Sequence, residues 1–220
     1  MRRLPTALCR HWPRTGYGWI EILWGAQLIL DEYKLAYYYT LRTEARRRVV
    51  EQINRRATTD RSRETWGGIT LASVDLEAIE YARLEWPKYY GADTHQGFSQ
   101  SWERLYYKFA QMPDHFGVAI WQDIEDKKVL QGLALGKPSR AKTHLTVNWV
   151  ERSFEPTYFR GGILVPILAC AEEYGNLLGC ERVLIKDPID PEVYRRYGYA
   201  PFTLHKGAEY LAKELPHGCA

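Results

Sequence analysis

The chain has 220 residues and a mass of 25.7 kDa, which fits one medium domain or one domain with an appendage. With 45% hydrophobic and 26% charged residues and a mean hydropathy of −0.44, its composition excludes a disordered or fibrous protein. The net charge is +3, but residues 1–66 carry 13 lysines and arginines against 7 acidic residues. This local excess indicates an acidic partner at the N-terminal end or an arginine-rich, solvated helix face.

The cysteines and the N-terminal stretch predict a reduced, cytoplasmic setting. The four cysteines are scattered, at Cys9, Cys170, Cys180 and Cys219. They form no Cys-x-x-Cys pair and have no histidine at ligand spacing, so we predict no metal site. Residues 4–16 hold prolines and basic residues instead of the apolar core of a secretory signal. The most apolar stretch, 19–39, contains four charged residues, too many for a membrane span.

Most of residues 19–57 is predicted to form one long helix or a helical hairpin. Apolar residues recur every three or four positions from Ile22 through Leu41 to Ile53, the spacing of an amphipathic helix. The polar stretch 58–68 has no periodicity and ends in two glycines, so we interpret it as a linker. The chain is therefore predicted to divide into a basic helical extension, 1–66, and a domain, 67–220.

From residue 69 the pattern changes to short, alternating elements. Strands are predicted at Ile69–Val74, Phe116–Gln122, Val129–Leu135, His144–Phe154, Glu181–Lys186, Ala200–Leu204 and Glu209–Lys213. Helices are predicted from Asp75, as the cap, to about Trp86, and at Ser99–Met112, Ile163–Gly175 and Pro191–Tyr197. Residues 88–98 look like a loop, and Asp123–Lys128 looks like the turn of an antiparallel hairpin. The order β-α-α-β-β-β-α-β-α-β-β indicates an α/β domain with a mixed sheet.

Several enzyme signatures are absent from the sequence. It contains no G-x-x-x-x-G-K-[ST] phosphate loop, G-x-S-x-G elbow, H-E-x-x-H helix or G-x-G-x-x-G turn. These absences argue against nucleotide triphosphatases, serine hydrolases, zinc proteases and NAD enzymes.

One strand-to-helix turn has the composition of an anion site. The strand ending at Phe154 leads through Arg160, Gly161 and Gly162 into the helix that opens at Ile163. Glycines there leave backbone N–H groups free, and the helix N-terminus adds partial positive charge, a combination that suits a pyrophosphate. The arginine could add a charge-assisted contact. The alternative is a plain turn in which the glycines supply unusual backbone angles.

The element order and these motifs resemble the Gcn5-related N-acetyltransferase (GNAT) superfamily over residues 69–215. The segments that carry the resemblance are the opening strand and helix at 69–79, the turn and helix at Glu155–Leu168, VYRRYGY at 193–199 and AEYLAKEL at 208–215. The second segment is similar to the family's acyl-CoA pyrophosphate loop, R/Q-x-x-G-x-G/A, with Phe159 at the Arg/Gln position and Leu164 at the last glycine. The third is similar to the ending L-Y-x-K-x-G-F.

The resemblance implies a mostly antiparallel mixed sheet whose fourth and fifth strands splay apart around a thioester. It implies acetyl-CoA as the acyl donor and a primary amine of a small molecule or protein as the acceptor, which attacks directly in a ternary complex. The implied cofactor-binding residues are Ser153, Phe154, Phe159, Arg160, Gly161, Gly162 and Ile163. Backbone groups near the first two would pair with the pantetheine arm.

Two side chains are candidates for the chemistry. Tyr194 aligns with the family's general acid, which protonates the leaving thiolate, and the alternative is a core tyrosine. The attacking amine must lose a proton, and Glu151, on the strand beside the cleft, is our candidate base. His144 is a weaker one. Tyr197 is interpreted as packing, and Asp187 as a turn residue.

The acceptor and the partners stay open at this point. The clusters Arg46–Arg48 and Arg55–Arg56, near three consecutive tyrosines, could meet nucleic-acid phosphates and bases, which makes a nucleic-acid acceptor the second hypothesis. A GNAT-like binding module without turnover is the third. The N-terminal helices could form a lid, act as a dimer arm of a homodimer, or cover the sheet. No membrane partner is expected.

Overall fold

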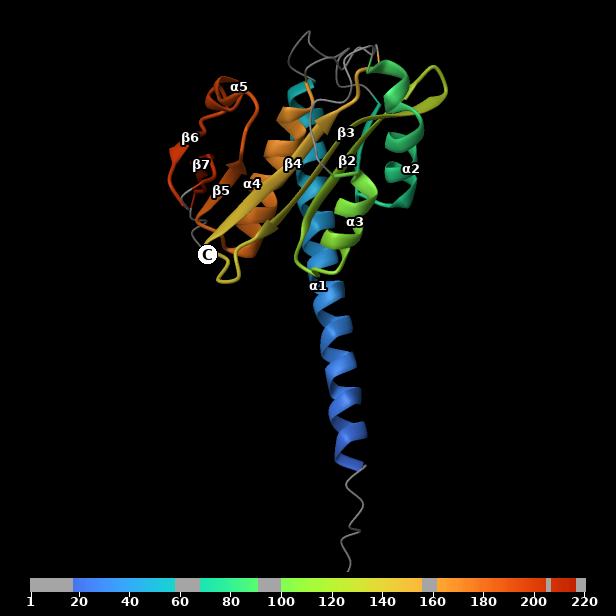
Figure 1. The fold of residues 1–220 in the computed structure, drawn as a ribbon, viewed down its shortest axis with the longest axis vertical. Helices are drawn as coiled ribbons and strands as arrows, with labels where there is room; N and C mark the ends of the chain where they lie inside the picture. The colour runs from blue at the N-terminus through green and yellow to red at the C-terminus, as the bar shows by residue number, and fades with distance from the viewer. Residues whose placement is uncertain (1–17, 58–67, 91–99, 156–161, 205–206, 217–220) are drawn as a thin grey trace, which may run out of the picture.

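The computed structural model describes residues 18–57, 68–90, 100–155, 162–204 and 207–216. They form one seven-stranded sheet in the order β1-β2-β3-β4-β5-β7-β6, with helices on both faces (Figure 1). The strands are β1 Ile69–Ala72, β2 Phe116–Ile124, β3 Lys127–Pro138, β4 His144–Arg152, β5 Arg182–Lys186, β6 Ala200–Phe202 and β7 Tyr210–Glu214. The helices are α1 Gly18–Ala57, α2 Leu76–Leu84, the 3₁₀ turn η2 Trp86–Tyr89, α3 Trp102–Ala110, α4 Leu164–Leu178 and α5 Pro191–Arg195. All strand pairs are antiparallel except β4 with β5.

The predicted fold class and element order are confirmed. Asp75 caps α2 as expected, because its Oδ1 accepts the N–H of Ala78 at 2.9 Å. Several bounds differ from the prediction: the strand expected to reach Phe154 ends at Arg152, and a 3₁₀ turn precedes the expected loop. The hairpin turn is shorter than Asp123–Lys128 because Glu125 and Asp126 both adopt positive φ, at 47° and 64°, which matches the twist of the two strands.

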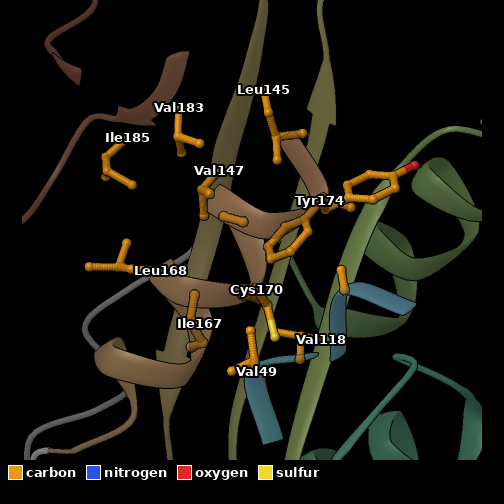
Figure 2. Close-up of a cluster of buried hydrophobic side chains, with 14 of the residues drawn as sticks. Val49, Val118, Leu145, Val147, Ile167, Leu168, Cys170, Tyr174, Val183 and Ile185 are labelled. Atoms are coloured by element: carbon orange, nitrogen blue, oxygen red, sulfur yellow. The ribbon is translucent and has the colours of Figure 1, made fainter. Parts of the chain in front are cut away.

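The sheet separates two apolar layers. On one face, α4 and the second half of α1 pack against the central strands, and Figure 2 shows Ile167, Cys170 and Tyr174 of α4 among strand residues. On the other face, α2 and α3 cover β2 and β3 through Trp86, Trp102 and other buried rings. β4 is the central strand of the sheet and lies between these two layers.

Helix α1 is 40 residues long, about 60 Å at 1.5 Å per residue, and only its second half joins the core. Ala45, Val49 and Ile53 are buried there. The helical prediction for 19–57 is confirmed, and the segment forms one long helix. Its second half covers the sheet, which was one of the predicted alternatives, whereas its first half projects beyond the other elements (Figure 1). The predicted domain boundary near residue 66 lies outside the described residues.

A close backbone contact shapes β4 next to its parallel partner. β3 and β4 change register between Leu135 and Gly136, so that Asn148 is an extra residue on β4. A Cβ atom on Gly136 would lie 2.3 Å from the carbonyl oxygen of Thr146. Only glycine therefore permits this approach of the two strands.

Gly136→Ala is expected to lower the free energy of unfolding by about 2–4 kcal/mol, because backbone atoms cannot move aside cheaply. Urea denaturation measures the loss. Gly117→Ala on β2 is the matched control: its Cβ would lie 3.4 Å from Leu135 Cδ2, an ordinary contact. The control should change stability by less than about 1 kcal/mol. Equal effects of the two substitutions would contradict the close contact at Gly136.

Candidate functional site

A cleft opens where the two parallel strands part. β4 and β5 pair only from His144 with Arg182 to Val147 with Ile185. β4 then continues to Arg152, whereas β5 ends at Lys186 and the chain turns away at Asp187, whose φ is 47°. The resulting cleft has a volume of ≈ 460 Å³, within the range of small-molecule sites. Its lining comes from residues 147–152 of β4, from Ile163 and Leu164 where α4 begins, from residues 185–190 at the end of β5 and after it, and from Val193 and Tyr194 of α5.

Tyr194 is held on one wall by the short helix α5. Asp190 caps this helix by accepting the N–H of Glu192 at 3.1 Å, and Pro191 occupies the first helical position. Burial, and next the charge of Asp190, raise the pKa of the Tyr194 phenol to about 12. In the part of the chain that the structure describes, no group accepts its hydroxyl proton. The side chain is therefore a protonated donor that faces the cleft at neutral pH.

Glu151 stands on the opposite wall, and two aromatic side chains hold its carboxylate. The hydroxyl of Tyr90 donates to Oε1 at 2.9 Å, and the indole Nε1 of Trp102 donates to Oε2. Both donors are neutral, so they orient and stabilise the carboxylate without cancelling its charge. Sequence reasoning assigned neither residue to the site: Tyr90 falls in the expected loop, and Trp102 reads as a core residue of a helix.

A second carboxylate of the same kind lies just past the end of β4. Glu155 accepts hydrogen bonds from the hydroxyls of Tyr81 at 3.3 Å and Tyr89 at 3.2 Å. Burial, followed by the charge of Glu155, raises the pKa of Tyr81, and for Tyr89 the charge of Glu155 is the main cause of the rise. The end of β4 thus carries two glutamates, each fixed by aromatic donors from the α2–α3 layer.

The backbone groups of β4 that face the cleft belong to residues just before the predicted Ser153 and Phe154. The N–H of Ser153 donates to the carbonyl of Gln131 on β3 at 2.8 Å, so it points away from β5. Alternate residues of a strand turn their backbone groups to opposite edges, so those of Val150 and Arg152 face the cleft. Residues 147–152 of β4 line the cleft, whereas Ser153 and Phe154, two of the predicted cofactor-binding residues, do not.

The start of α4 forms the end of the cleft. Gly162 and Ile163 lie immediately before the helix, and Ile163 and Leu164 line the cleft. Val165 donates its N–H to the carbonyl of Gly162 at 3.3 Å, and Pro166 has no N–H. Leu164 is therefore the helical residue of the first turn that can offer a backbone donor, in addition to the partial positive charge of the helix end. Phe159, Arg160 and Gly161 lie outside the described residues.

Of the remaining candidates, His144 and Tyr197 do not line the cleft, whereas Asp187 lines it as a turn residue. His144 lies at the far end of β4, where its ring contacts Thr143 Oγ1 at 3.1 Å. Asp187 is the predicted turn residue: its N–H donates to the carbonyl of Glu209 and its Oδ1 accepts the N–H of Glu209. Tyr197 packs against the main core, as expected.

The arginine run on α1 makes internal contacts. Arg46 is buried and donates to the carbonyl of Gly117 at 3.4 Å. Arg47 and Arg48 both pair with Glu44, and Arg48 also pairs with Glu173 of α4 at 2.6 Å. These contacts tie α1 to the sheet and to α4. The predicted nucleic-acid partner stays a prediction.

The described residues hold neither a metal-binding cluster nor a helix that could span a membrane. They contain no cluster of three histidine, cysteine or acidic side chains placed to hold a metal. Among the same residues, no helix has the length and apolar character needed to cross a bilayer.

No protein-family model and no curated protein matches the chain. Among solved structures, nourseothricin acetyltransferase is 21% identical over 47% of this chain and 67% of its own, with a TM-score of 0.38. A GNAT-superfamily phosphinothricin acetyltransferase from Sinorhizobium meliloti, in complex with acetyl-CoA, is 14% identical over 69% and 91%, with a TM-score of 0.49. N-acetylglutamate synthase from Neisseria gonorrhoeae, complexed with coenzyme A and N-acetyl-glutamate, is 12% identical over 67% and 35%, with a TM-score of 0.49. At these identities and scores the likeness assigns no activity to this chain. A proposal about its activity has to come from the residues that line its cleft.

The hydrogen bonds to Glu151 predict unequal effects of two substitutions. Glu151→Leu removes the acceptor from both the Tyr90 hydroxyl and the Trp102 indole, so it should destabilise the fold by about 1–3 kcal/mol. Glu151→Gln keeps an acceptor oxygen and should cost clearly less. Thermal and urea unfolding of the two variants measure the difference. Equal stability of the leucine and glutamine variants would contradict the role of these donors.

Proposed function

We propose that the protein is an acyl-CoA-dependent N-acyltransferase that transfers an acetyl group from acetyl-CoA to a primary amine of a small molecule or protein. The observation that carries the proposal is the cleft between β4 and β5, with the protonated phenol of Tyr194 on one wall and the carboxylate of Glu151 on the other. A general acid and a candidate base across one cleft are the two proton-transfer groups that aminolysis of a thioester needs.

The residues around the cleft suit a long, amide-containing acyl donor with a pyrophosphate. The cleft-facing backbone of Val150 and Arg152 would pair with the amides of a pantetheine arm, as an added strand would. The backbone from Gly162 to Leu164, at the positive end of α4, would hold the pyrophosphate. When bound, acetyl-CoA supplies the activated acyl group.

The two walls belong to opposite faces of the sheet, which supports direct transfer. Tyr194 and Val150 pack with the α1–α4 layer, whereas Trp149 and the donors to Glu151 belong to the α2–α3 layer. A donor entering from one face and an amine entering from the other would meet where the strands part. This arrangement favours a ternary complex, in which proximity lowers the barrier.

Each reacting proton then has a place to go. Glu151 takes a proton from the ammonium form of the acceptor, and the neutral nitrogen attacks the thioester carbonyl carbon. A backbone N–H at the cleft edge stabilises the oxyanion. As the carbon–sulfur bond breaks, Tyr194 gives its proton to the leaving sulfur. The extra proton on the attacking nitrogen then passes to the Tyr194 oxygen, which leaves a neutral amide and restores the phenol, and Glu151 releases its proton to solvent.

The first test is binding of the acyl donor. Calorimetry should detect acetyl-CoA binding by the parent, and Gly162→Asp should weaken it at least about 10-fold, because the carboxylate adds bulk and like charge at the pyrophosphate. Asn176→Asp, which adds the same charge at the exposed far end of α4, is the control and should bind like the parent. Parent-like binding by Gly162→Asp would remove the pyrophosphate from this turn.

The second test concerns the general acid. Tyr194→Phe keeps the ring but removes the transferable proton, so turnover should fall about 10²-fold or more while acetyl-CoA affinity barely changes. Release of coenzyme A, measured with a thiol reagent, reports turnover with a panel of amines or by slow hydrolysis. Tyr197→Phe is the matched control on a packed tyrosine and should keep parent rates. Parent rates in a folded Tyr194→Phe would exclude Tyr194 from the mechanism.

A further inference from the structure

The short helix that carries Tyr194 has little packing of its own. α5 is five residues long, and none of them is fully buried. After α5 the chain reverses at Gly198, whose φ is 87°. There the N–H groups of Tyr197 and Tyr199 both donate to the carbonyl of Tyr194, at 2.9 and 3.3 Å. The place of the Tyr194 side chain therefore depends on the residues that follow α5 and reach the core.

Tyr199 is buried directly beside Tyr194. It is only 2% exposed and belongs to the apolar layer formed by α4 and the second half of α1. The two rings meet edge to face, with their centroids 6.5 Å apart and an angle of 76° between their planes. Aromatic pairs favour this arrangement, and a ring in a packed core cannot shift without displacing its neighbours. The Tyr199 ring thus limits the positions that the half-buried Tyr194 ring can take.

An ion pair fixes the hydroxyl of Tyr199. The hydroxyl donates to Oε1 of Glu172 on α4 at 3.2 Å, and Lys213 Nζ on β7 donates to both oxygens of the same carboxylate at 2.8 Å. Burial, followed by the charge of Glu172, raises the pKa of Tyr199 well above its usual value, so the phenol stays a donor. A hydrogen bond to a charged acceptor is stronger than one between neutral groups. The orientation of the Tyr199 ring is therefore set from α4 and β7.

We propose that Tyr199 is a positioning residue for the reaction: held by Glu172 and Lys213, it keeps the Tyr194 phenol in place on the cleft wall. The proposal rests on the proposed acyltransferase function.

The chemistry of a general acid makes such support necessary. The phenol of Tyr194 must come within hydrogen-bond reach of the leaving sulfur, and a misplacement of about 1 Å can lower a rate by roughly 10²-fold. α5 cannot hold this position alone, because its own side chains are not fully buried. Tyr199 does not line the cleft and touches no reacting atom, so it acts only through Tyr194.

The kinetic constants of Tyr199→Phe test this role. The substitution keeps the ring and removes only the hydroxyl bond to Glu172. Turnover, kcat, measured by release of coenzyme A, should fall at least about 5-fold, while the KM for acetyl-CoA should change less than about 2-fold. Tyr174→Phe is the matched control, because this buried tyrosine of α4 also loses one hydroxyl bond, to the carbonyl of Asp114 at 3.0 Å. It should keep the parent kcat.

A double-variant cycle separates positioning from general support of the fold. In the Tyr194→Phe background the phenolic proton is already gone, so adding Tyr199→Phe should change the remaining kcat by less than about 1.5-fold. A residue that merely supports the fold would lower kcat by the same factor in both backgrounds, and that result would overturn the proposal.

The carboxylate of Glu172 supplies a second set of variants. Glu172→Gln keeps an acceptor oxygen for the Tyr199 hydroxyl and should retain most of the kcat, whereas Glu172→Leu should lower it as Tyr199→Phe does. Glu214→Gln, which breaks an ion pair between β7 and β5, is the control and should keep the parent kcat.

The outcomes distinguish the positioning role from the proposed function. If Tyr199→Phe and Glu172→Leu keep the parent kcat while Tyr194→Phe is slow, the positioning role is wrong and the proposed function stands. If Tyr194→Phe is as fast as the parent, or the parent releases no coenzyme A with any amine, the general acid or the activity itself is wrong. The positioning role is then wrong as well.

Discussion

The site depends on one constraint, the early end of the parallel pairing between β4 and β5. Four residue pairs join the strands, and after Val147 they separate. The separation has a cause on each strand. On β4, the close approach at Gly136 makes room for the extra residue Asn148, which bends the strand. On β5, the positive φ of Asp187 turns the chain away from the sheet. Strand edges without partners are normally a liability in proteins. Here the unpaired edge lines a cleft.

The environments of Tyr194 and Glu151 differ in a way that suits the opposite roles proposed for them. Burial beside an acidic group keeps the phenol of Tyr194 protonated, and the neutral donors Tyr90 and Trp102 keep Glu151 supplied with hydrogen bonds as a carboxylate. One group can give a proton and the other can accept one at the same pH. The two environments differ because the sheet separates them: each wall of the cleft belongs to a different apolar layer.

Most of the fold was predictable because its signals are local. The Asp75 cap acts over three residues, and the hairpin turn lies between two apolar strands. Tyr194 and Glu151 were both identified from sequence and line the same cleft. The rest depends on contacts between distant residues: Glu151 meets Tyr90 and Trp102 across 61 and 49 positions of the chain. The direction of the Ser153 amide depends on strand register, which no local pattern fixes.

The arginine run has a structural role inside the molecule. Arg46 is buried and finds an acceptor in the carbonyl of Gly117, whereas the exposed Arg47 and Arg48 pair with Glu44, and Arg48 also with Glu173. These bonds fix the second half of α1 against the sheet and α4 and thereby set the axis of the whole helix. The first half continues as part of the same helix and projects beyond the other elements (Figure 1). Arg46 and Arg48 thus anchor the second half of α1, and the predicted nucleic-acid partner stays a prediction.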